Sequence, residues 1–292
     1  MEFKKLELSD IEELKTYFTD NPYRICDCTI GGTFMWRDYH KTQFAIEDEV
    51  LYLKVDYPIP AFAPPRGANA GKPAYDRIID YCAQSGTNAC ICSVSGTTLN
   101  YLLRLFPGAK AQTDRSWSDY LYLSGDLINL AGRKFSGQRN HINRFMREHP
   151  DWEFAPIDQS NLHEARAYIV KHANEHVKDY PAYTEGNTKA IETLDNWAAY
   201  GQSGGVLIAG GKIVGATIGE TVGDTLFVHV EKADADCNGA YPVLMSQFAK
   251  ALATDEVLYI NREEDDGVEG LRVSKLSYHP VAILDKYNVE IS

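Results

Sequence analysis

The chain has 292 residues, enough for one large domain or two of ordinary size, and hydrophobic residues make up 44% of it. The net charge of −12 argues against a broad DNA-binding surface, because phosphate groups favour clustered lysine and arginine. No stretch approaches the roughly 18 consecutive apolar residues of a membrane span, and the start MEFKKLELSD lacks the apolar core of a signal peptide. We therefore expect a soluble cytoplasmic protein without a transmembrane segment.

The N-terminal segment has a counterpart in the second half of the sequence. FKKLELSDIEELKTYF begins at Phe3, and FAPIDQSNLHEARAYI begins at Phe154. Phenylalanine, serine, glutamate and tyrosine coincide at matching positions. Each copy predicts a short strand, a serine at the helix N-cap and an amphipathic helix. The match predicts a tandem duplication.

The elements that follow each copy come in a similar order. The first half continues with a hairpin in QFAIEDEVLYLKVDYP, then helix, strand, helix and strand in AYDRIIDYCAQ, NACICSV, TTLNYLLRLF and WSDYLYLS. The second half has the hairpin GGVLIAGGKIVGATIGE, the strand TLFVHVEKAD, then YPVLMSQFAKALA, VLYINRE, VEGLRVSKL and a short C-terminal strand. This order predicts an α/β (α+β) fold of two tandem domains, residues 1–125 and 126–292, each a mixed β-sheet flanked by helices.

A basic helix is predicted near residues 136–149, at the junction of the two halves, with Lys134 just before it. Three of its polar residues recur every four positions and therefore share one face: Arg139, Asn143 and Arg147. Ile142 and Phe145 face elsewhere and are predicted to pack inward. The basic face fits contact with an anion such as a tRNA end, a phospholipid head group or a nucleotide. A solvated helix that bridges the two halves fits the pattern equally well.

The six cysteines include no CxxC pair, so we expect reduced structural thiols and no metal site. KHANEHV spells H-x-x-E-H with His172, Glu175 and His176, a pattern found in some zinc enzymes. The motif is short and lacks a clear third ligand. We therefore expect these polar groups to line a cleft or face solvent.

The second half resembles the GNAT acyltransferase fold in its series of hairpin, strand, turn, helix and strand. Three stretches are closer still to one family: FSGQRNHINRFMREHPDWEF, FVHVEKADADCNGAYPVLMSQFA and NREEDDGVEGLRVSKLSY. They resemble soluble proteins related to the C-terminal domain of phosphatidylglycerol lysyltransferase. The resemblance implies two tandem GNAT-like domains and no tightly bound cofactor. It also implies transfer of an aminoacyl group from aminoacyl-tRNA to an amine or hydroxyl, whereas other GNAT members use acyl-coenzyme A (acyl-CoA).

In GNAT proteins the fourth and fifth strands diverge, and N–H groups at the start of the helix after the fourth strand hold the donor's pyrophosphate. The equivalent turn here departs from the usual Q/R-x-x-G-x-G/A pattern. Asp234 and Asp236 would repel a pyrophosphate, which disfavours coenzyme A and favours aminoacyl-tRNA or another donor. The resemblance still implies donor contacts from the turn residues Asp236, Cys237, Asn238, Gly239 and Ala240. The basic-helix residues Lys134, Arg139, Asn143 and Arg147 complete the predicted donor-binding set.

Glu231 ends the strand TLFVHVE, where a buried carboxylate could take the proton of an attacking amine. A salt bridge with Lys232 or Arg262 is the alternative interpretation. His229 lies two residues earlier, on the same predicted strand face, and could orient Glu231 or replace it as the base. A histidine with only a structural role in the core is the alternative for His229.

Tyr278 follows the last predicted helix, near where GNAT enzymes often place a tyrosine that protonates the leaving group. A packed aromatic side chain is the alternative. Asn261 and Arg262 leave the strand VLYINRE beside the expected divergence, with Glu263 next to them. We predict that these three residues hold the acceptor.

Together these features predict an acyl or aminoacyl transferase whose C-terminal half carries the site. A small molecule or a lipid head group is the expected acceptor, and tRNA is an expected partner. The alternative is a non-catalytic ligand-binding or regulatory module that keeps the fold. Polar residues clustered at Glu231, Asn261 and Tyr278 favour the enzyme, whereas the altered donor turn favours the module. The sequence leaves the donor, the acceptor and the oligomeric state open.

Overall fold

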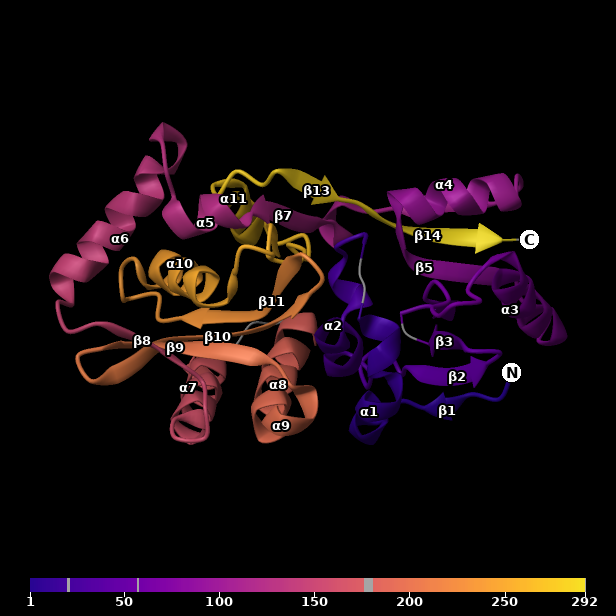
Figure 1. Ribbon diagram of the computed structural model, residues 1–292, viewed down its shortest axis with the longest axis horizontal. Coiled ribbons are helices and arrows are strands. Elements are labelled where there is room, and N and C mark those ends of the chain that lie inside the picture. The colour runs from indigo at the N-terminus through magenta and orange to yellow at the C-terminus, as the bar shows by residue number, and fades with distance from the viewer. Residues whose placement is uncertain (20–21, 57, 176–180, 292) are drawn as a thin grey trace. The chain divides into compact units, whose positions relative to one another are not determined.

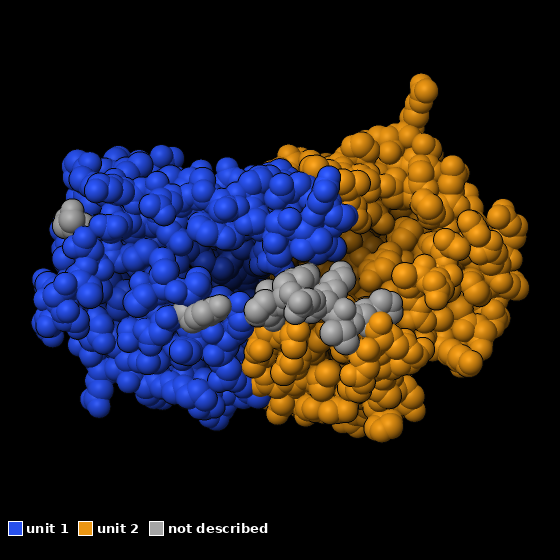
Figure 2. Space-filling model, turned by 180° about the vertical axis from the view of Figure 1, so that it is seen from behind, with its two compact units in different colours: residues 1–119, 264–272, 283–292 blue, residues 120–263, 273–282 orange. Residues whose placement is uncertain are grey.

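The computed structural model describes residues 1–19, 22–56, 58–175 and 181–291 (Figure 1). The chain forms two compact units, coloured separately in Figure 2. Unit 1 comprises Met1–Asp119, Glu264–Arg272 and Ile283–Ser292. Unit 2 comprises Tyr120–Glu263 and Val273–Ala282. Each unit therefore draws on separate parts of the sequence.

Unit 1 contains a seven-stranded sheet in the order β1-β2-β3-β4-β5-β14-β6. Its strands are β1 (Lys4–Lys5), β2 (Gln43–Glu47), β3 (Val50–Val55), β4 (Ala61–Phe62), β5 (Ala89–Ser95), β14 (Lys286–Ile291) and β6 (Lys110–Thr113). Among the described strands of this sheet, only β4 and β5 pair in parallel, so the sheet is mixed. The α-helices of this unit are α1 (Ile11–Leu14), α2 (Ile30–Met35), α3 (Lys72–Gln84) and α4 (Gly96–Leu105).

A second seven-stranded sheet, in the order β13-β7-β12-β11-β10-β9-β8, lies in unit 2 except for Asp119 at the start of β7 and residues 283–284 of β13, which belong to unit 1. Its strands are β13 (Ala282–Leu284), β7 (Asp119–Leu123), β12 (Tyr259–Asn261), β11 (Thr225–Ala233), β10 (Lys212–Val222), β9 (Ser203–Ala209) and β8 (Glu153–Pro156). The pair β11 and β12 is parallel, so this sheet is mixed as well. The predicted fold of two mixed sheets with flanking helices is confirmed.

The helices that belong wholly to unit 2 are α5 (Ser124–Asn129), α6 (Ser136–Glu148), α7 (Leu162–Glu175), α8 (Pro181–Asp195), α9 (Trp197–Tyr200) and α10 (Ala240–Leu252). Helix α11 (Glu269–Leu276) is divided between the units after residue 272. Among the described residues, no helix is both long and apolar enough to cross a bilayer.

The two sheets are built in the same way. Each has five strands in chain order, β1 to β5 or β8 to β12, then one inserted strand, β14 or β7, then a last strand, β6 or β13. β1 and β8, the strands at the starts of the two repeated segments, take the same edge position. Chain order predicts that the WSDYLYLS strand belongs to the first half and the C-terminal strand to the second. The structure instead places β7 in the second sheet and β14 in the first, a choice of partner that local sequence pattern does not encode.

The hairpin turns follow the predicted positions. Gly210 and Gly211 connect β9 and β10 with φ values of 58° and 69°, as a two-residue hairpin turn requires. Asp48 and Glu49 connect β2 and β3 in the same left-handed region without a glycine. The turn at Asp48 and Glu49 therefore has a higher conformational cost than the turn at Gly210 and Gly211.

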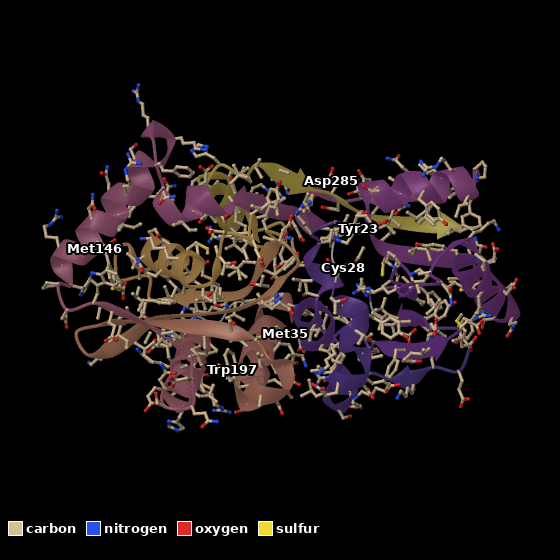
Figure 3. The ribbon with its side chains drawn as sticks, in the orientation of Figure 1. Tyr23, Cys28, Met35, Met146, Trp197 and Asp285 are labelled. Carbon is tan, nitrogen blue, oxygen red and sulfur yellow. The ribbon has the colours of Figure 1, made fainter. Side chains whose placement is uncertain are left out.

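Helix α6 packs against unit 2 through an apolar face. Phe145 is fully buried in a cluster with Val243 and Leu244 of α10, and Ile142 and Met146 pack against that cluster. Met146 is labelled in Figure 3. The predicted inward positions of Ile142 and Phe145 are therefore confirmed.

Candidate active site

Strands β11 and β12 diverge within unit 2. They pair only where Thr225–Phe227 face Tyr259–Asn261. Beyond this point β11 continues to Ala233, whereas β12 ends at Asn261. Residues 228–233 and the segment after Asn261 therefore form two separate arms.

A salt bridge connects the two arms. Arg262 Nη2 donates to Glu231 Oε1 over 2.8 Å, and the two side chains are only 9% and 12% exposed. Burial alone would lower the pKa of Arg262, but the Glu231 carboxylate outweighs this effect and raises it. The salt bridge that the sequence offered as an alternative does form, and it uses one of the two carboxylate oxygens.

Two buried polar atoms of these side chains take no part in the salt bridge. Glu231 Oε2 and Arg262 Nη1 have no hydrogen-bond partner within the described part of the chain. One is an acceptor and the other is a donor. Such buried atoms cost about 1–3 kcal/mol each when unsatisfied, so the pair is suited to a polar ligand.

Tyr278 lies beside this salt bridge. The Arg262 guanidinium carbon is 4.8 Å from the centre of the Tyr278 ring and 5.9 Å from that of Tyr122. Burial raises the pKa of Tyr278 to about 12, so the hydroxyl keeps its proton at neutral pH. Three predicted site residues, Glu231, Arg262 and Tyr278, thus lie together in unit 2.

The turn after β12 fixes the position of Arg262. Asn261 is fully buried, and its Oδ1 accepts the backbone N–H of Glu263 at 2.6 Å. Glu263 has a φ of 55°, in the left-handed region. Lys275 Nζ donates to the carbonyl of Arg262 over 2.6 Å and to that of Glu263 over 3.3 Å. Asn261 therefore holds the backbone, and only Arg262 of the three predicted acceptor residues joins the Glu231 cluster.

His229 lies in an irregular part of β11. Ile218 pairs with Val230 and Gly219 pairs with Val228, so His229 is the extra residue of a β-bulge. Its Nε2 lies 2.8 Å from Glu220 Oε1, and its Nδ1 lies 2.7 Å from Glu263 Oε1. The bulge thus directs the ring to these carboxylates instead of Glu231.

The charge of His229 changes the expected role. Burial would lower the pKa of His229, but hydrogen bonds to Glu220 and Glu263 raise it to about 10. An imidazolium held by two carboxylates has no free lone pair at neutral pH. These contacts favour a cross-link between the two arms over the predicted role of His229 as a base.

The predicted basic face of α6 is only partly available. Arg139 Nη1 donates to the carbonyls of Leu130 and Gly132 and so closes the turn between α5 and α6. Lys134 forms a salt bridge with Asp126 at 2.8 Å. Asn143 and Arg147 are exposed. Of the three residues expected to form one anion-binding face, Arg139 is therefore bound within the turn, whereas the other two remain exposed.

The turn before α10 is covered by α6. Gly239 has a φ of 92°, and a Cβ at this position would collide with the backbone carbonyl of His141 on α6. Cys237 Sγ lies 3.5 Å from His149 Nε2 of the segment after α6. Asp236 and Asn238 are exposed, whereas Ala240 is buried. Little room remains beside Gly239 for a pyrophosphate.

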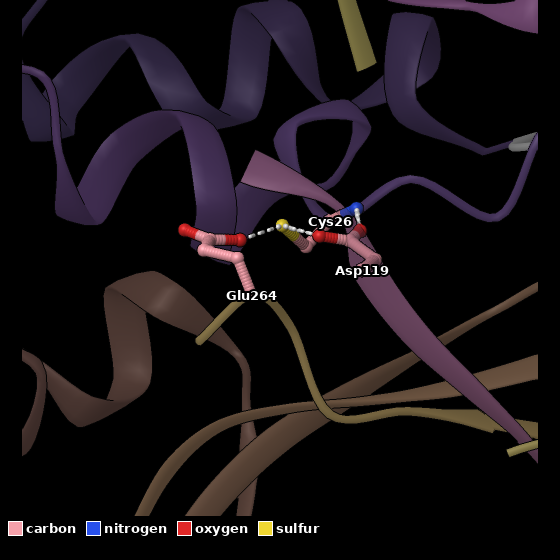
Figure 4. Close-up of side chains that lie close together, drawn as sticks. All are labelled: Cys26, Asp119 and Glu264. Atoms are coloured by element: carbon pink, nitrogen blue, oxygen red, sulfur yellow. Dashed lines mark hydrogen bonds between the residues drawn. The ribbon is translucent and has the colours of Figure 1, made fainter. Parts of the chain in front are cut away.

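A separate polar cluster is buried in unit 1 (Figure 4). Cys26 Sγ and one carboxylate oxygen each from Asp119 and Glu264 lie within 4.8 Å of one another. These are metal-ligating groups, but Lys286 Nζ lies 2.9 Å from Asp119, 3.0 Å from Glu264 and 2.7 Å from Asp27. The ammonium supplies the positive charge that a metal ion would supply.

Protonation within this cluster follows from burial and charge. Burial raises the pKa of Asp119 to about 7, helped by Glu264 and Asp27 and opposed by Lys286. Burial also raises the pKa of the Cys26 thiol. Cys26 therefore stays protonated and does not suit a nucleophilic or metal-binding role.

Within the described ranges, the remaining motif candidates form no further site. All six cysteines are free thiols, as predicted. His172 of the H-x-x-E-H motif is buried on α7, and Glu175 ends that helix. His176 lies outside the described residues.

The structure adds residues that sequence reasoning missed. Thr217 on β10 lies directly opposite Glu231, Glu220 bonds to His229, and Lys275 supports the Arg262 backbone. Strand register and the bulge position Thr217 and Glu220, and helix α11 carries Lys275. Neither feature has a local sequence signal beyond a polar residue in an otherwise apolar strand.

Residues 22–290 match the family described as phosphatidylglycerol lysyltransferase, C-terminal. A solved structure of a conserved protein of unknown function from Bacteroides thetaiotaomicron VPI-5482 is 34% identical, with a TM-score of 0.92 and 99% coverage of both chains. The C-terminal domain of a putative lysylphosphatidylglycerol synthetase from Agrobacterium fabrum is 15% identical. Its TM-score is 0.70, with 97% of this chain and 91% of that chain covered.

The fold is also similar to that of a GNAT-family acetyltransferase from Colwellia psychrerythraea. That protein is 11% identical and has a TM-score of 0.53, with 100% of both chains covered. The predicted tandem GNAT-like fold is therefore confirmed. An uncharacterized protein from Mycoplasmoides gallisepticum is 23% identical over 183 residues, which is 60% of this chain. The alignment spans 57% of the length of that relative, little more than half.

Proposed function

The chain belongs to the family of phosphatidylglycerol lysyltransferase C-terminal domains, and we propose that unit 2 carries its active site. Family and fold point to an acyl or aminoacyl transferase of the GNAT-like kind. The proposed reaction moves an aminoacyl group from aminoacyl-tRNA, or an acyl group from acyl-CoA, to an amine or hydroxyl acceptor. The acceptor is a small molecule or a lipid head group.

One observation carries this proposal: Glu231, Arg262 and Tyr278 supply complementary groups at the divergence of two strands. Within the described chain, Glu231 Oε2 is a buried acceptor and Arg262 Nη1 a buried donor, each without a partner. Tyr278 adds a protonated hydroxyl on a ring whose centre lies 4.8 Å from the Arg262 guanidinium carbon. Acyl transfer needs a proton acceptor, a donor for the oxyanion and a proton source for the leaving group.

The roles follow from these groups. The acceptor nitrogen or oxygen attacks the acyl carbon, and Glu231 Oε2 takes the proton that the nucleophile loses. Arg262 Nη1 donates to the carbonyl oxygen as negative charge develops on it. The carbon–oxygen bond to tRNA, or the carbon–sulfur bond to coenzyme A, then breaks. Tyr278 gives its proton to the departing atom.

His229 has a positioning role in this scheme. It connects β11 to the segment after β12 through Glu263, while Arg262 and Glu231 make a second connection. Holding these groups at fixed positions lowers the entropic cost of the reaction. The exposed Asn143 and Arg147 on α6 are proposed contacts for an anionic donor.

The test is a transfer assay with two donor panels. The purified chain is supplied with labelled aminoacyl-tRNAs or with acyl-CoA compounds, together with amine and hydroxyl acceptors. We expect transfer from one panel, and Glu231→Gln and Tyr278→Phe should each reduce kcat by about 100- to 10,000-fold. Glu256→Gln and Tyr23→Phe change exposed residues and serve as matched controls.

The outcomes separate the two candidate functions. Donor binding without transfer would favour the ligand-binding module and contradict the enzyme. Full activity in Glu231→Gln, with unfolding temperature unchanged, would reject Glu231 as the base. If the protein neither binds a donor nor transfers a group, the result would count against both functions.

A further inference from the structure

A buried hydroxyl lies next to the proposed base. Thr217 on β10 is directly opposite Glu231 in the antiparallel pair β10–β11, so the two side chains share a face of the sheet. Cβ atoms of such a pair lie about 4.5–5.5 Å apart. Thr217 is 1% exposed, and its Oγ1 has no hydrogen-bond partner in the described part of the chain.

Apolar groups surround Thr217 on its other sides. On the β9 side, Thr217 lies opposite Gly205. A Cβ on Gly205 would collide with the Phe154 ring, so this ring covers the β9 side of Thr217. Gly215 and Gly219 flank Thr217 along β10. A Cβ on either glycine would lie 3.3 Å from an α10 side chain, Leu244 at Gly215 and Phe248 at Gly219. The polar direction left to the Thr217 hydroxyl is toward Glu231.

We propose that Thr217 is a further acceptor-binding residue and that Thr217 and Glu231 together select a primary amine over a hydroxyl. This inference rests on the proposed transferase function. A neutral primary amine has two N–H groups and one lone pair. It donates one N–H to Glu231 Oε2 and the other to Thr217 Oγ1, while its lone pair points at the acyl carbon.

A hydroxyl acceptor satisfies this site less well. Its single O–H goes to Glu231 Oε2, and Thr217 then stays unsatisfied or donates to the oxygen that must attack. The first case leaves a buried polar atom unpaired, and the second withdraws electron density from the nucleophile. Attack by the amine forms a carbon–nitrogen bond as the bond to the donor oxygen or sulfur breaks. Glu231 takes the amine proton, and the leaving atom takes a proton from Tyr278.

The test compares acceptors that differ in one group. Glycinamide is paired with glycolamide, and vesicles containing phosphatidylethanolamine are paired with vesicles containing phosphatidylglycerol. The first pair probes a small acceptor and the second a lipid head group. We expect kcat/KM to favour the amine member by about 10- to 100-fold. The product should survive mild alkali, which cleaves esters but not amides.

Variants of Thr217 test its part in this preference. Thr217→Val keeps the shape and removes the hydroxyl, so KM for the amine should rise about tenfold, with a smaller change in kcat. Thr217→Ser should restore most of the affinity. Thr221→Val changes an exposed threonine on the same strand and serves as the control.

Each outcome decides between the proposals. Transfer to the hydroxyl member alone, with an alkali-labile product, would overturn the amine preference and leave the transferase function standing. An unchanged KM in Thr217→Val would remove Thr217 from the site. Failure to transfer to either member from any donor would reject the function itself, and the inference with it.

Discussion

At the scale of single residues, two titratable side chains on β11 differ in role because their surroundings differ. One carboxylate oxygen of Glu231 accepts a hydrogen bond from Arg262, and the other has no partner among the described residues and is the proposed proton acceptor. Both ring nitrogens of His229 are hydrogen-bonded to carboxylates. The contacts of His229 therefore suit a structural role, although histidine is a common catalytic base.

His229 should make stability depend on pH. Its pKa is near 6.5 in the unfolded chain and about 10 in the folded protein, so folding favours the protonated form. The stabilising effect is complete below about pH 6.5 and is lost as pH rises toward 10. In this window the free energy of unfolding should fall by at most about 1.4 kcal/mol per pH unit for this one proton.

Urea unfolding at several pH values between 6 and 9.5 measures this effect. The decline should be steeper in the unmodified protein than in His229→Gln, which cannot bind the proton. His163→Gln alters an exposed histidine and should retain the full decline. Parallel curves for the unmodified protein and His229→Gln would show that Glu220 and Glu263 do not hold a charged imidazole.

Residues at the ends of predicted elements could be placed from the sequence. Glu231, Arg262 and Tyr278 follow from reading where strands and a helix stop, and the structure brings these side chains together. Thr217 could not be placed, because its position depends on strand register. The bulge at His229 adds one residue to β11 and changes the direction of a side chain that strict alternation had aligned with Glu231.

At the scale of elements, the pairing of α6 with α10 shapes the turn that was expected to bind the donor. The apolar periodicity of α6 correctly indicated which residues face inward. It could not show that Arg139 would turn back to two carbonyls of its own approach segment. It also could not show that the α6 backbone would lie against Gly239.

Gly239 is predicted to be essential for this pairing. Gly239→Ala adds a methyl group that collides with the His141 carbonyl, and alanine also disfavours a φ of 92°. Overpacking and backbone strain together should lower the free energy of unfolding by about 2–4 kcal/mol. Gly223→Ala is the matched control, since its φ is also positive but a Cβ there meets no atom within 4 Å.

Denaturant unfolding measures both alanine variants. Gly223→Ala should lose only the backbone part, about 1 kcal/mol. Equal losses in the two variants would mean that α6 shifts away from Gly239 at little cost. The turn before α10 would then be able to open for a donor.

At the scale of the whole molecule, each sheet includes one strand that breaks its chain order, β14 in the first sheet and β7 in the second. β14 lies between β5 and β6 and pairs with both, and Val289 at its centre is fully buried. The alternation of apolar and polar residues allowed most strands to be located from the sequence. Which sheet receives β7 or β14 depends on tertiary packing, so chain order alone gave the wrong partner. The division at residues 125 and 126 stays a prediction about the duplicated halves.

Val289→Pro should unfold the sheet of unit 1 selectively. Proline removes a backbone N–H and does not fit a central strand, so β5 and β6 both lose their shared neighbour. Hydrogen exchange should accelerate in β5 and β6 while β9 and β10 of unit 2 stay protected. Val289→Ala keeps the N–H and should preserve the protection pattern. Uniform exchange across both sheets would show that the two units unfold together.

The position of β14 also has a consequence for synthesis on the ribosome. β5 and β6 emerge long before residues 286–291 exist, and at about 5–20 residues per second the delay is roughly 10 to 35 seconds. During that time the apolar strand ACICSVS has an unpaired edge where β14 will later bind. Such an edge is a template for aggregation. The nascent chain therefore has a period in which chaperone protection or slow codons downstream of β6 would improve its yield.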